Sequence, residues 1–230
     1  MKASAIIVAA GSGSRLGRGE PKAFVPLAGR TLLSYSLGAI ARVSAIGEIV
    51  IAVPAGMEPV ARQEAAGIRI PVKITAGGAE RQDSVRIALA ITAAQSELVI
   101  VHDAARPLAP RELFEACLAG AERCGGAIAA TPVADTLKRV GDDRAIAATV
   151  ARAGLWQAQT PQAFRRALLQ AAHAHADREG IKATDDADLV ERIGGRVEVV
   201  ECAVPNFKIT TATDLALAEA LVSGGYLPGR

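Results

Sequence analysis

The chain has 230 residues, of which half are hydrophobic and 3% aromatic, and 26 basic against 24 acidic residues leave a net charge of +2. This balance excludes a protein that binds nucleic acid through a basic stripe, and no apolar run approaches the roughly 18 residues that cross a bilayer. We therefore expect neither a nucleic-acid nor a membrane partner. Cys117, Cys124 and Cys202 form no CxxC pair, which is typical of reduced thiols and favours a cytoplasmic protein.

Short runs rich in valine and isoleucine alternate with amphipathic, alanine- and leucine-rich stretches. The runs predict buried strands at 5–9, 48–53, 72–75, 98–101, 127–131 and 197–202. The amphipathic stretches predict helices at 31–42, 58–66, 83–93, 110–123, 161–178, 185–193 and 211–222. Alternating strands and helices predict an α/β fold with a mostly parallel twisted sheet flanked by helices, which we expect to be a single domain over residues 1–230.

Residues 135–159 break this alternation. The letters GDD at 141–143 indicate a turn between possible strands at 136–140 and 145–150, which predicts a β-hairpin arm projecting from the main sheet. A two-stranded ribbon is marginally stable alone in water, so it is expected to pack on something. A second subunit would make this a dimerisation arm, and the alternative is a ribbon folded back onto its own domain.

The glycine-rich segment AAGSGSRLGRGEPK, residues 9–22, directly follows the first expected strand. Leu16 stands where the dinucleotide fingerprint has its third glycine, and no glycine–lysine pair of a P-loop exists. Glycines let backbone N–H groups surround phosphate oxygens, while Arg15 can donate a fork of hydrogen bonds and Lys22 supplies a compact charge. The segment predicts a loop that wraps a triphosphate; the alternative is a glycine-rich turn with solvated cations.

A second segment, VHDAARP at 101–107, follows the fourth expected strand at the carboxyl edge of the sheet, where open α/β sheets bind ligands. Asp103 can orient a sugar hydroxyl or assist a magnesium ion. Arg106 can contact phosphate or tie down the loop. His102 precedes the acid, and a histidine at a strand end is more often structural than a catalytic base.

A third segment, GGAERQDSV at 77–85, lies between the third expected strand and a helix. Its two glycines permit close approach of the backbone to a ligand. Ser84 can read a base edge. Arg81 and Asp83 can instead pair with each other as a structural clamp.

Other polar residues are expected to have structural roles only. His173 and His175 lie in an expected helix without an acidic partner at ligand spacing, so we expect both at the surface. Thr211 followed by Asp214 predicts a capping box at the start of the last helix.

Together with PVADTLK, LWQAQTPQAF, TDDADLVE and NFKITTATDLALAE, these segments span almost the whole chain. In this order they resemble the 2-C-methyl-D-erythritol 4-phosphate cytidylyltransferase family. The resemblance implies a Rossmann-like nucleotidyltransferase whose projecting arm interlocks a homodimer. It also implies a reaction that joins CTP and methylerythritol phosphate, with magnesium, and releases pyrophosphate.

The resemblance also implies roles for individual residues. Arg15 and Lys22 would stabilise charge on the α-phosphate. Positions matching the CTP site are Ala9, Ala10, Gly11, Gly13, Gly78, Ser84, Asp103, Ala104 and Arg106. Positions matching the methylerythritol phosphate site are Thr136, Arg152, Thr160, Thr184 and Lys208, of which the first two lie on or near the arm and could serve the partner's site.

Related sugar-nucleotide synthetases carry a second acidic metal ligand late in the chain, and residues 204–206 offer none. We therefore expect Mg²⁺ to be held mainly by the CTP phosphates, without a direct protein ligand. The alternative function is a cytidylyltransferase for another polyol or sugar phosphate, such as ribitol 5-phosphate. A catalytically silent nucleotide-binding module would be expected to lack Arg15 or Lys22, and both are present.

Overall fold

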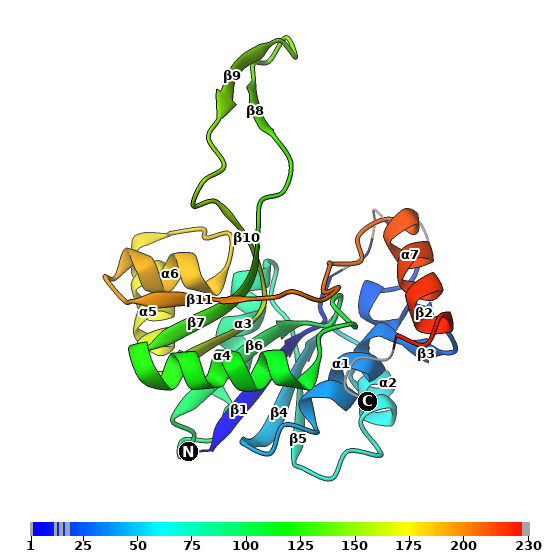
Figure 1. The fold of residues 1–230 in the computed structure, drawn as a ribbon. Coiled ribbons are helices and arrows are strands. Elements are labelled where there is room, and N and C mark those ends of the chain that lie inside the picture. Colours follow the sequence, from blue (N-terminus) through cyan, green and yellow to red (C-terminus); the bar gives the residue numbers. More distant parts are fainter. Residues whose placement is uncertain (1, 12, 14–15, 17–18, 227–230) are drawn as a thin grey trace.

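A seven-stranded sheet forms the centre of the protein in a computed structural model that describes residues 2–11, 13, 16 and 19–226. Its strands lie in the order β11 (Val197–Glu201), β7 (Gly126–Pro132), β10 (Trp156–Arg165), β6 (Leu98–Asp103), β1 (Ala3–Val8), β4 (Ile46–Val53) and β5 (Val72–Ala76). All are parallel except β10, which runs antiparallel to both β6 and β7 (Figure 1). The predicted mostly parallel sheet is therefore confirmed.

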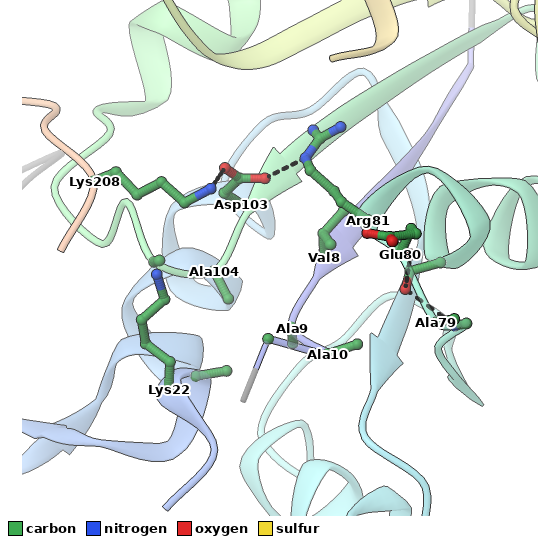
Figure 2. A pocket seen from close by; sticks show the side chains of 15 residues that line it. Val8, Ala9, Ala10, Lys22, Ala79, Glu80, Arg81, Asp103, Ala104 and Lys208 are labelled. Atoms are coloured by element: carbon green, nitrogen blue, oxygen red, sulfur yellow. Dashed lines mark hydrogen bonds and ion pairs between the residues drawn. The ribbon is translucent and has the colours of Figure 1, made fainter. Parts of the chain in front are cut away.

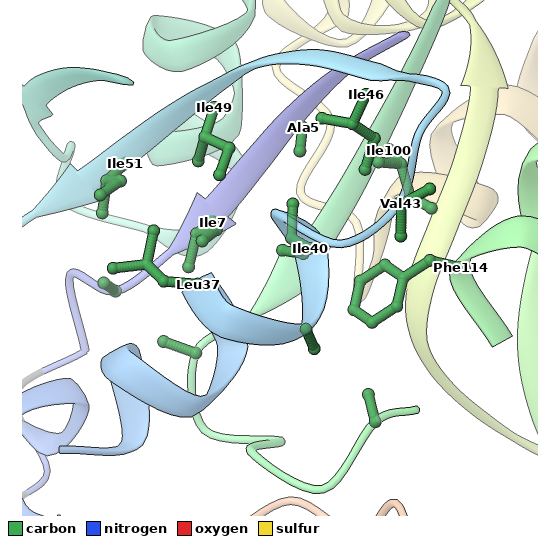
Figure 3. Packing of buried hydrophobic residues seen from close by; sticks show 14 of the residues in the cluster. Ala5, Ile7, Leu37, Ile40, Val43, Ile46, Ile49, Ile51, Ile100 and Phe114 are labelled. Carbon is green, nitrogen blue, oxygen red and sulfur yellow. The ribbon is translucent and has the colours of Figure 1, made fainter. Parts of the chain in front are cut away.

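Alternating side chains of the buried strands supply two separate cores. On β1, Ala5 and Ile7 face one side while Ile6 faces the other, as expected for strands covered on both faces. The first side packs against α1 (Leu32–Ile40), α2 (Glu58–Glu64) and α4 (Arg111–Cys124), and Figure 3 shows Leu37 and Ile40 of α1 against it. The second side packs against α3 (Arg81–Ala90), α5 (Arg166–Glu179) and α6 (Asp186–Arg192).

The last helix, α7 (Ala212–Ser223), packs beside the short strand β2 (Pro26–Leu27), which pairs with β3 (Arg30–Thr31). It begins with the predicted capping box, because the Thr211 hydroxyl accepts from the backbone N–H of Asp214 and the Asp214 carboxylate accepts from that of Thr211. A short 3₁₀ turn, η2 (Lys22–Phe24), links the glycine-rich loop to β2. Within the described residues, no helix is both long and apolar enough to cross a membrane.

The predicted arm is present. Strands β8 (Leu137–Val140) and β9 (Ile146–Val150) pair antiparallel and extend away from the sheet (Figure 1). Nearly all their residues are exposed, so the alternative of a ribbon folded back onto its own domain is wrong.

The predicted helix at 161–178 starts too early. Residues 161–165 instead complete β10, and α5 begins at Arg166. Ala163 and Phe164 are fully buried where β10 lies between β6 and β7. This burial in the middle of the sheet outweighs the helical propensity of the alanine-rich sequence that follows.

Candidate active site

A cavity of about 370 Å³ opens at the carboxyl edge of the sheet, between the ends of β1 and β6 and the start of α3 (Figure 2). It is lined by residues of all three segments singled out in the sequence and by a lysine near α7: Val8, Ala9, Ala10, Gly11, Lys22, Ala23, Gly78, Ala79, Glu80, Arg81, Ser84, Asp103, Ala104, Ala105 and Lys208. The sheet therefore gathers residues that lie up to 200 positions apart in the chain, as Val8 and Lys208 do.

The glycine-rich loop places Lys22 in this cavity. The Lys22 backbone N–H donates to the Gly11 carbonyl at 3.2 Å, and a Cβ at Gly13 would lie 3.1 Å from that of Lys22. Gly13 has φ of +72°, a left-handed conformation that glycine adopts without steric cost. Gly11 and Gly13 thus lie close against Lys22, whereas the second predicted catalytic residue, Arg15, lies outside the described residues.

Asp103 at the end of β6 is held between two cations. Its Oδ1 accepts from Arg81 Nε at 3.0 Å and its Oδ2 from Lys208 Nζ at 2.7 Å, as Figure 2 shows. Burial alone would raise the pKa of this carboxyl, but Arg81, Lys208 and Arg106 outweigh that effect and hold the pKa well below its ordinary value. Asp103 is therefore ionised, with both oxygens engaged.

Arg81 does not form the clamp with Asp83 that the sequence left open. Its second contact, from Nη1, is to Asp186 Oδ2 at 2.8 Å, while Asp83 accepts from the backbone N–H of Glu80 in the capping box of α3. The surface position expected for His173 is also wrong, because its side chain is buried with Nε2 3.2 Å from Asp186 Oδ1. Sequence proximity suggested the wrong partner for Arg81 and none for His173.

His102 has a structural place beside this site. The backbone N–H of Asp103 donates to Thr160 Oγ1 at 3.0 Å, Thr160 Oγ1 lies 3.1 Å from His102 Nδ1, and His102 Nε2 lies 3.1 Å from the Arg106 carbonyl. A neutral imidazole with its proton on Nε2 satisfies these contacts, because it accepts from the Thr160 hydroxyl and donates to the Arg106 carbonyl. Burial lowers the pKa of His102 to about 4, so the ring is neutral at physiological pH.

The loop at the start of α3 is closely packed. A Cβ at Gly77 would lie 2.5 Å from that of Ala10, and one at Gly78 would lie 2.3 Å from that of Asp83. The Ser84 hydroxyl accepts from the backbone N–H of Gly78 and donates to the Glu80 carbonyl, both at 3.1 Å. Ser84 lines the cavity, and its hydrogen bonds hold the shape of this loop.

A second cavity of about 240 Å³ adjoins the first and shares Arg81, Asp103 and Lys208 with it. Its other walls come from the loop after β6, from β10 and from the start of α6: Arg106, Ala158, Gln159, Thr160, Gln162, Thr184 and Asp185. Three predicted acceptor residues, Thr160, Thr184 and Lys208, thus lie together. Two adjoining cavities with a charged common wall suit a reaction between two bound substrates.

Comparison with known proteins identifies the family to which this chain belongs. A family model described as 2-C-methyl-D-erythritol 4-phosphate cytidylyltransferase matches residues 3–224. The chain belongs to that family. Relatives bearing the same name in Deinococcus radiodurans and Syntrophotalea carbinolica are 47% and 45% identical, over 98% and 96% of this chain and 93% and 97% of theirs. The cytidylyltransferase crystal structure from Thermus thermophilus matches with a TM-score of 0.82 at 40% identity, covering 97% of this chain and 100% of that one.

Not every residue assigned by resemblance to the cytidylyltransferase family lies at the two cavities. Thr136 and Arg152 are exposed at the base of the arm and line neither cavity. Arg152 donates from Nη1 to the Ala134 carbonyl across that base. Arg106 reaches the second cavity, but its Nη1 donates to the Asn206 carbonyl at 2.7 Å, so this side chain does tie down the loop.

The described part of the site offers little to a metal ion. No group of three or more His, Cys, Asp or Glu side chains that could hold one occurs among the described residues. Asp103 is the acid at the common wall of the cavities, and both its oxygens already accept from cations.

Two positions at the site escaped the sequence analysis. Arg81 was considered only as a partner of Asp83. Asn206 was noted only as lacking a metal-binding carboxylate, yet it is buried and donates from Nδ2 to Gln159 Oε1 at 2.8 Å and to the Thr160 carbonyl at 2.9 Å. The one available signal was that both lie inside the segments that carry the family resemblance.

Proposed function

We propose that this chain transfers the cytidylyl group of CTP to 2-C-methyl-D-erythritol 4-phosphate, a step in the synthesis of isoprenoid precursors. The products are 4-diphosphocytidyl-2-C-methyl-D-erythritol and pyrophosphate. The observation that carries this proposal, beside membership of the family, is the pair of adjoining cavities that share Arg81, Asp103 and Lys208. CTP occupies the larger cavity and the acceptor the smaller one.

The reaction needs no nucleophilic side chain, because the acceptor phosphate is already an anion. One of its oxygens attacks the α-phosphorus of CTP in line, a new P–O bond forms, and the α–β bond breaks as pyrophosphate leaves. The difficulty is the charge of two anions that must meet, so catalysis consists of positioning and electrostatic stabilisation. Lys22, which lines the CTP cavity, and Arg15 stabilise the charge on the α-phosphate.

The remaining assignments follow the two cavities. Ala9, Ala10 and Gly11 at the end of β1 surround the phosphates, and Gly78 and Ser84 lie where the base is read. On the acceptor side, Lys208 seats the incoming phosphate, and its ion pair with Asp103 supports this role by holding the ammonium where both cavities meet. Thr160 and Thr184 line the rest of that wall.

The acceptor site is completed by a second copy of the chain in a homodimer. The arm supports this proposal because its large apolar side chains Val140 and Ile146 are 50% and 66% exposed, a pattern that marks interaction surfaces. Thr136 and Arg152 at its base would then reach the active site of the partner subunit.

Magnesium would be held by the triphosphate of the nucleotide, without a direct protein ligand, and would offset phosphate charge. The engagement of both Asp103 oxygens supports this assignment. We also place the protein in the cytoplasm, which is supported by its three cysteines all being free thiols and by the reducing chemistry of that compartment.

The test is release of pyrophosphate from CTP and Mg²⁺ with a panel of acceptors. We expect release with methylerythritol phosphate, and formation of the diphosphocytidyl product by mass spectrometry. Release with ribitol 5-phosphate but not with methylerythritol phosphate would assign the alternative function. No release with any acceptor would refute the proposal.

A further inference from the structure

We propose that Arg81 is a positioning residue that aligns the two substrates, because its guanidinium fastens a wall of each cavity to Asp103. The inference rests on the proposed function, since it assigns CTP to one cavity and the acceptor to the other. Arg81 itself need not touch the reacting atoms.

The contacts of Arg81 join three segments that are distant in the chain. Arg81 is the first residue of α3 and directly follows the loop at 77–80, whose residues 78–80 line the CTP cavity. Its Nε donates to Asp103 Oδ1 at 3.0 Å and its Nη1 to Asp186 Oδ2 at 2.8 Å. The Arg81 guanidinium thereby holds together three segments: the loop at 77–80, called here the CTP loop, the end of β6 and the start of α6.

The far end of this connection is itself rigid. Asp186 is the first residue of α6 and is 1% exposed, and its other oxygen is 3.2 Å from Nε2 of the buried His173. A carboxylate only accepts, so this nitrogen carries the proton and donates. Thr184 and Asp185, which directly precede Asp186, line the acceptor cavity. The α5 histidine therefore anchors the acceptor wall to which Arg81 is attached.

The near end of the connection reaches a proposed substrate contact. Asp103 Oδ2 accepts from Lys208 Nζ at 2.7 Å, so the orientation of the Asp103 carboxylate decides where the Lys208 ammonium lies. Arg81 sets that orientation through Oδ1. A shift of Arg81 would move the CTP loop, the Lys208 ammonium and the acceptor wall relative to one another, and misplacement by about 1 Å can cost about 100-fold in rate.

Lysine cannot reproduce this arrangement. An arginine fork directs two donors to two different carboxylates at fixed angles, whereas a lysine ammonium is a single point charge on a flexible stem. The Arg81→Lys variant therefore keeps the positive charge between two buried carboxylates and removes only the geometry. It separates positioning from simple charge balance.

The experiment is steady-state kinetics of Arg81→Lys with each substrate varied at a saturating concentration of the other. We expect KM to rise for both CTP and methylerythritol phosphate, with a fall of roughly 10–100-fold in kcat/KM for each. A merely structural role would instead reduce the fraction of folded enzyme, which lowers kcat and leaves both KM values unchanged. The matched control is Arg86→Lys on the same helix, where Arg86 is half exposed and its acidic neighbours are 3.8 and 4.0 Å away.

Asp186→Asn provides a second measurement, which decides the matter if Arg81→Lys does not fold. It leaves the Arg81–Asp103 contact in place and weakens only the attachment of the acceptor wall. We expect it to raise KM for methylerythritol phosphate more than KM for CTP. Unchanged KM values in a folded Arg81→Lys enzyme would overturn the inference, as would unchanged values in Asp186→Asn if the first variant is unfolded. Failure of the wild-type enzyme to use this acceptor would refute the proposed function instead.

Discussion

The edge of the central sheet and the β8–β9 arm both carry residues assigned to the acceptor, yet their surroundings are opposite. At the sheet edge, Asp103 is buried and its two carboxylate oxygens accept from Arg81 and Lys208 of the same chain. At the base of the arm, Arg152 is exposed and donates a hydrogen bond to the Ala134 carbonyl of its own chain. The difference teaches that one chain brings together the residues at the sheet edge by itself, while a role for the arm residues depends on the proposed second copy.

The largest expected effect concerns the part of the site that one chain completes. Lys22→Ala should lower kcat by roughly 100–1000-fold, the usual cost of losing one aligned donor to transition-state charge, with folding unchanged. The Arg15→Ala variant should behave in the same way. Lys182→Ala is the control, because Lys182 is 87% exposed and its acidic neighbour is 3.9 Å away. Turnover near wild type in either active-site variant would remove that residue from its role, as pyrophosphate release would show.

A second prediction tests how tightly the sheet edge is packed around CTP. In Gly78→Ala the new Cβ would meet Asp83 Cβ at 2.3 Å, so the loop must move and the CTP cavity must change. We expect roughly a 100-fold fall in kcat/KM for CTP. Gly67→Ala is the matched control, because a Cβ there meets nothing within 4 Å. Equal kinetics for the two variants would show that this loop does not shape the CTP site.

A third prediction uses the buried histidine of the sheet edge. The pKa of His102 is about 4 in the folded chain against 6.5 for the ordinary side chain, so below pH 6.5 the unfolded state binds the extra proton. The contribution of the neutral His102 to the free energy of unfolding is therefore fully present above pH 6.5 and is lost as the pH falls toward 4. Between pH 7.5 and 5.0 the loss should be about 2 kcal/mol.

Urea unfolding at the two pH values measures this loss. The lowered pKa of the buried carboxyls Asp103 and Asp186 changes stability only below about pH 4, the range of an unfolded aspartate. The window therefore isolates the histidine from these acids. His102→Gln should flatten the pH dependence and His175→Gln should keep it. An undiminished slope in His102→Gln would contradict the neutral hydrogen-bonded chain described for this residue.

The smallest effect is expected at the arm, where it bears most directly on the contrast between the two regions. Arg152→Ala should raise KM for methylerythritol phosphate about tenfold, as one charge-assisted contact typically contributes. Removing residues 137–150 and closing the gap with a short turn should convert the proposed dimer to a monomer in sedimentation experiments.

Mixing two defective chains makes the arm prediction sharper. If Arg152 serves the partner's site, an Arg152→Ala chain and a Lys22→Ala chain complement each other after subunit exchange. Random exchange gives about a quarter of the sites an intact Lys22 and an intact Arg152. KM for the acceptor in this restored fraction should match that of the wild type. Absence of any such fraction in a mixture shown to contain heterodimers would place Arg152 outside the partner's site.

Sequence reasoning recovered what depends on local pattern. Continuous apolar runs identified β1, β4 and β6, and the GDD turn identified the arm. It missed β10, because Pro161 and the alanines after it resemble the beginning of a helix and its antiparallel insertion between β6 and β7 depends on distant strands.

The charged partners in the site were missed for a related reason. Asp103 and Asp186 lie 22 and 105 positions from Arg81, whereas Asp83 lies two positions away, so proximity in the chain suggested the wrong pair. His173 was placed at the surface because its own helix offers no acid at ligand spacing, whereas its actual neighbour, Asp186, belongs to α6. The glycine segments and Lys22 were recognisable from the sequence, because backbone freedom and charge can be read without tertiary contacts, whereas Lys208 was placed at the site only by the family resemblance.

The placement of β10 has a consequence for engineering the protein. Strand β10 (Figure 1) leads from Trp156, 41% exposed below the arm, past Thr160 in the acceptor cavity to the fully buried Phe164. Its pairing with β7 is irregular between Ala158 and Gln162. A deletion that shortened this strand would shift its register and turn inward-facing side chains outward. The two limbs of the arm join where the Val133 N–H donates to the Leu155 carbonyl. A stable variant without the arm must therefore lose only residues between Val133 and Leu155. From Trp156 onward, the same strand, β10, both supports the arm and forms part of the wall of the acceptor cavity.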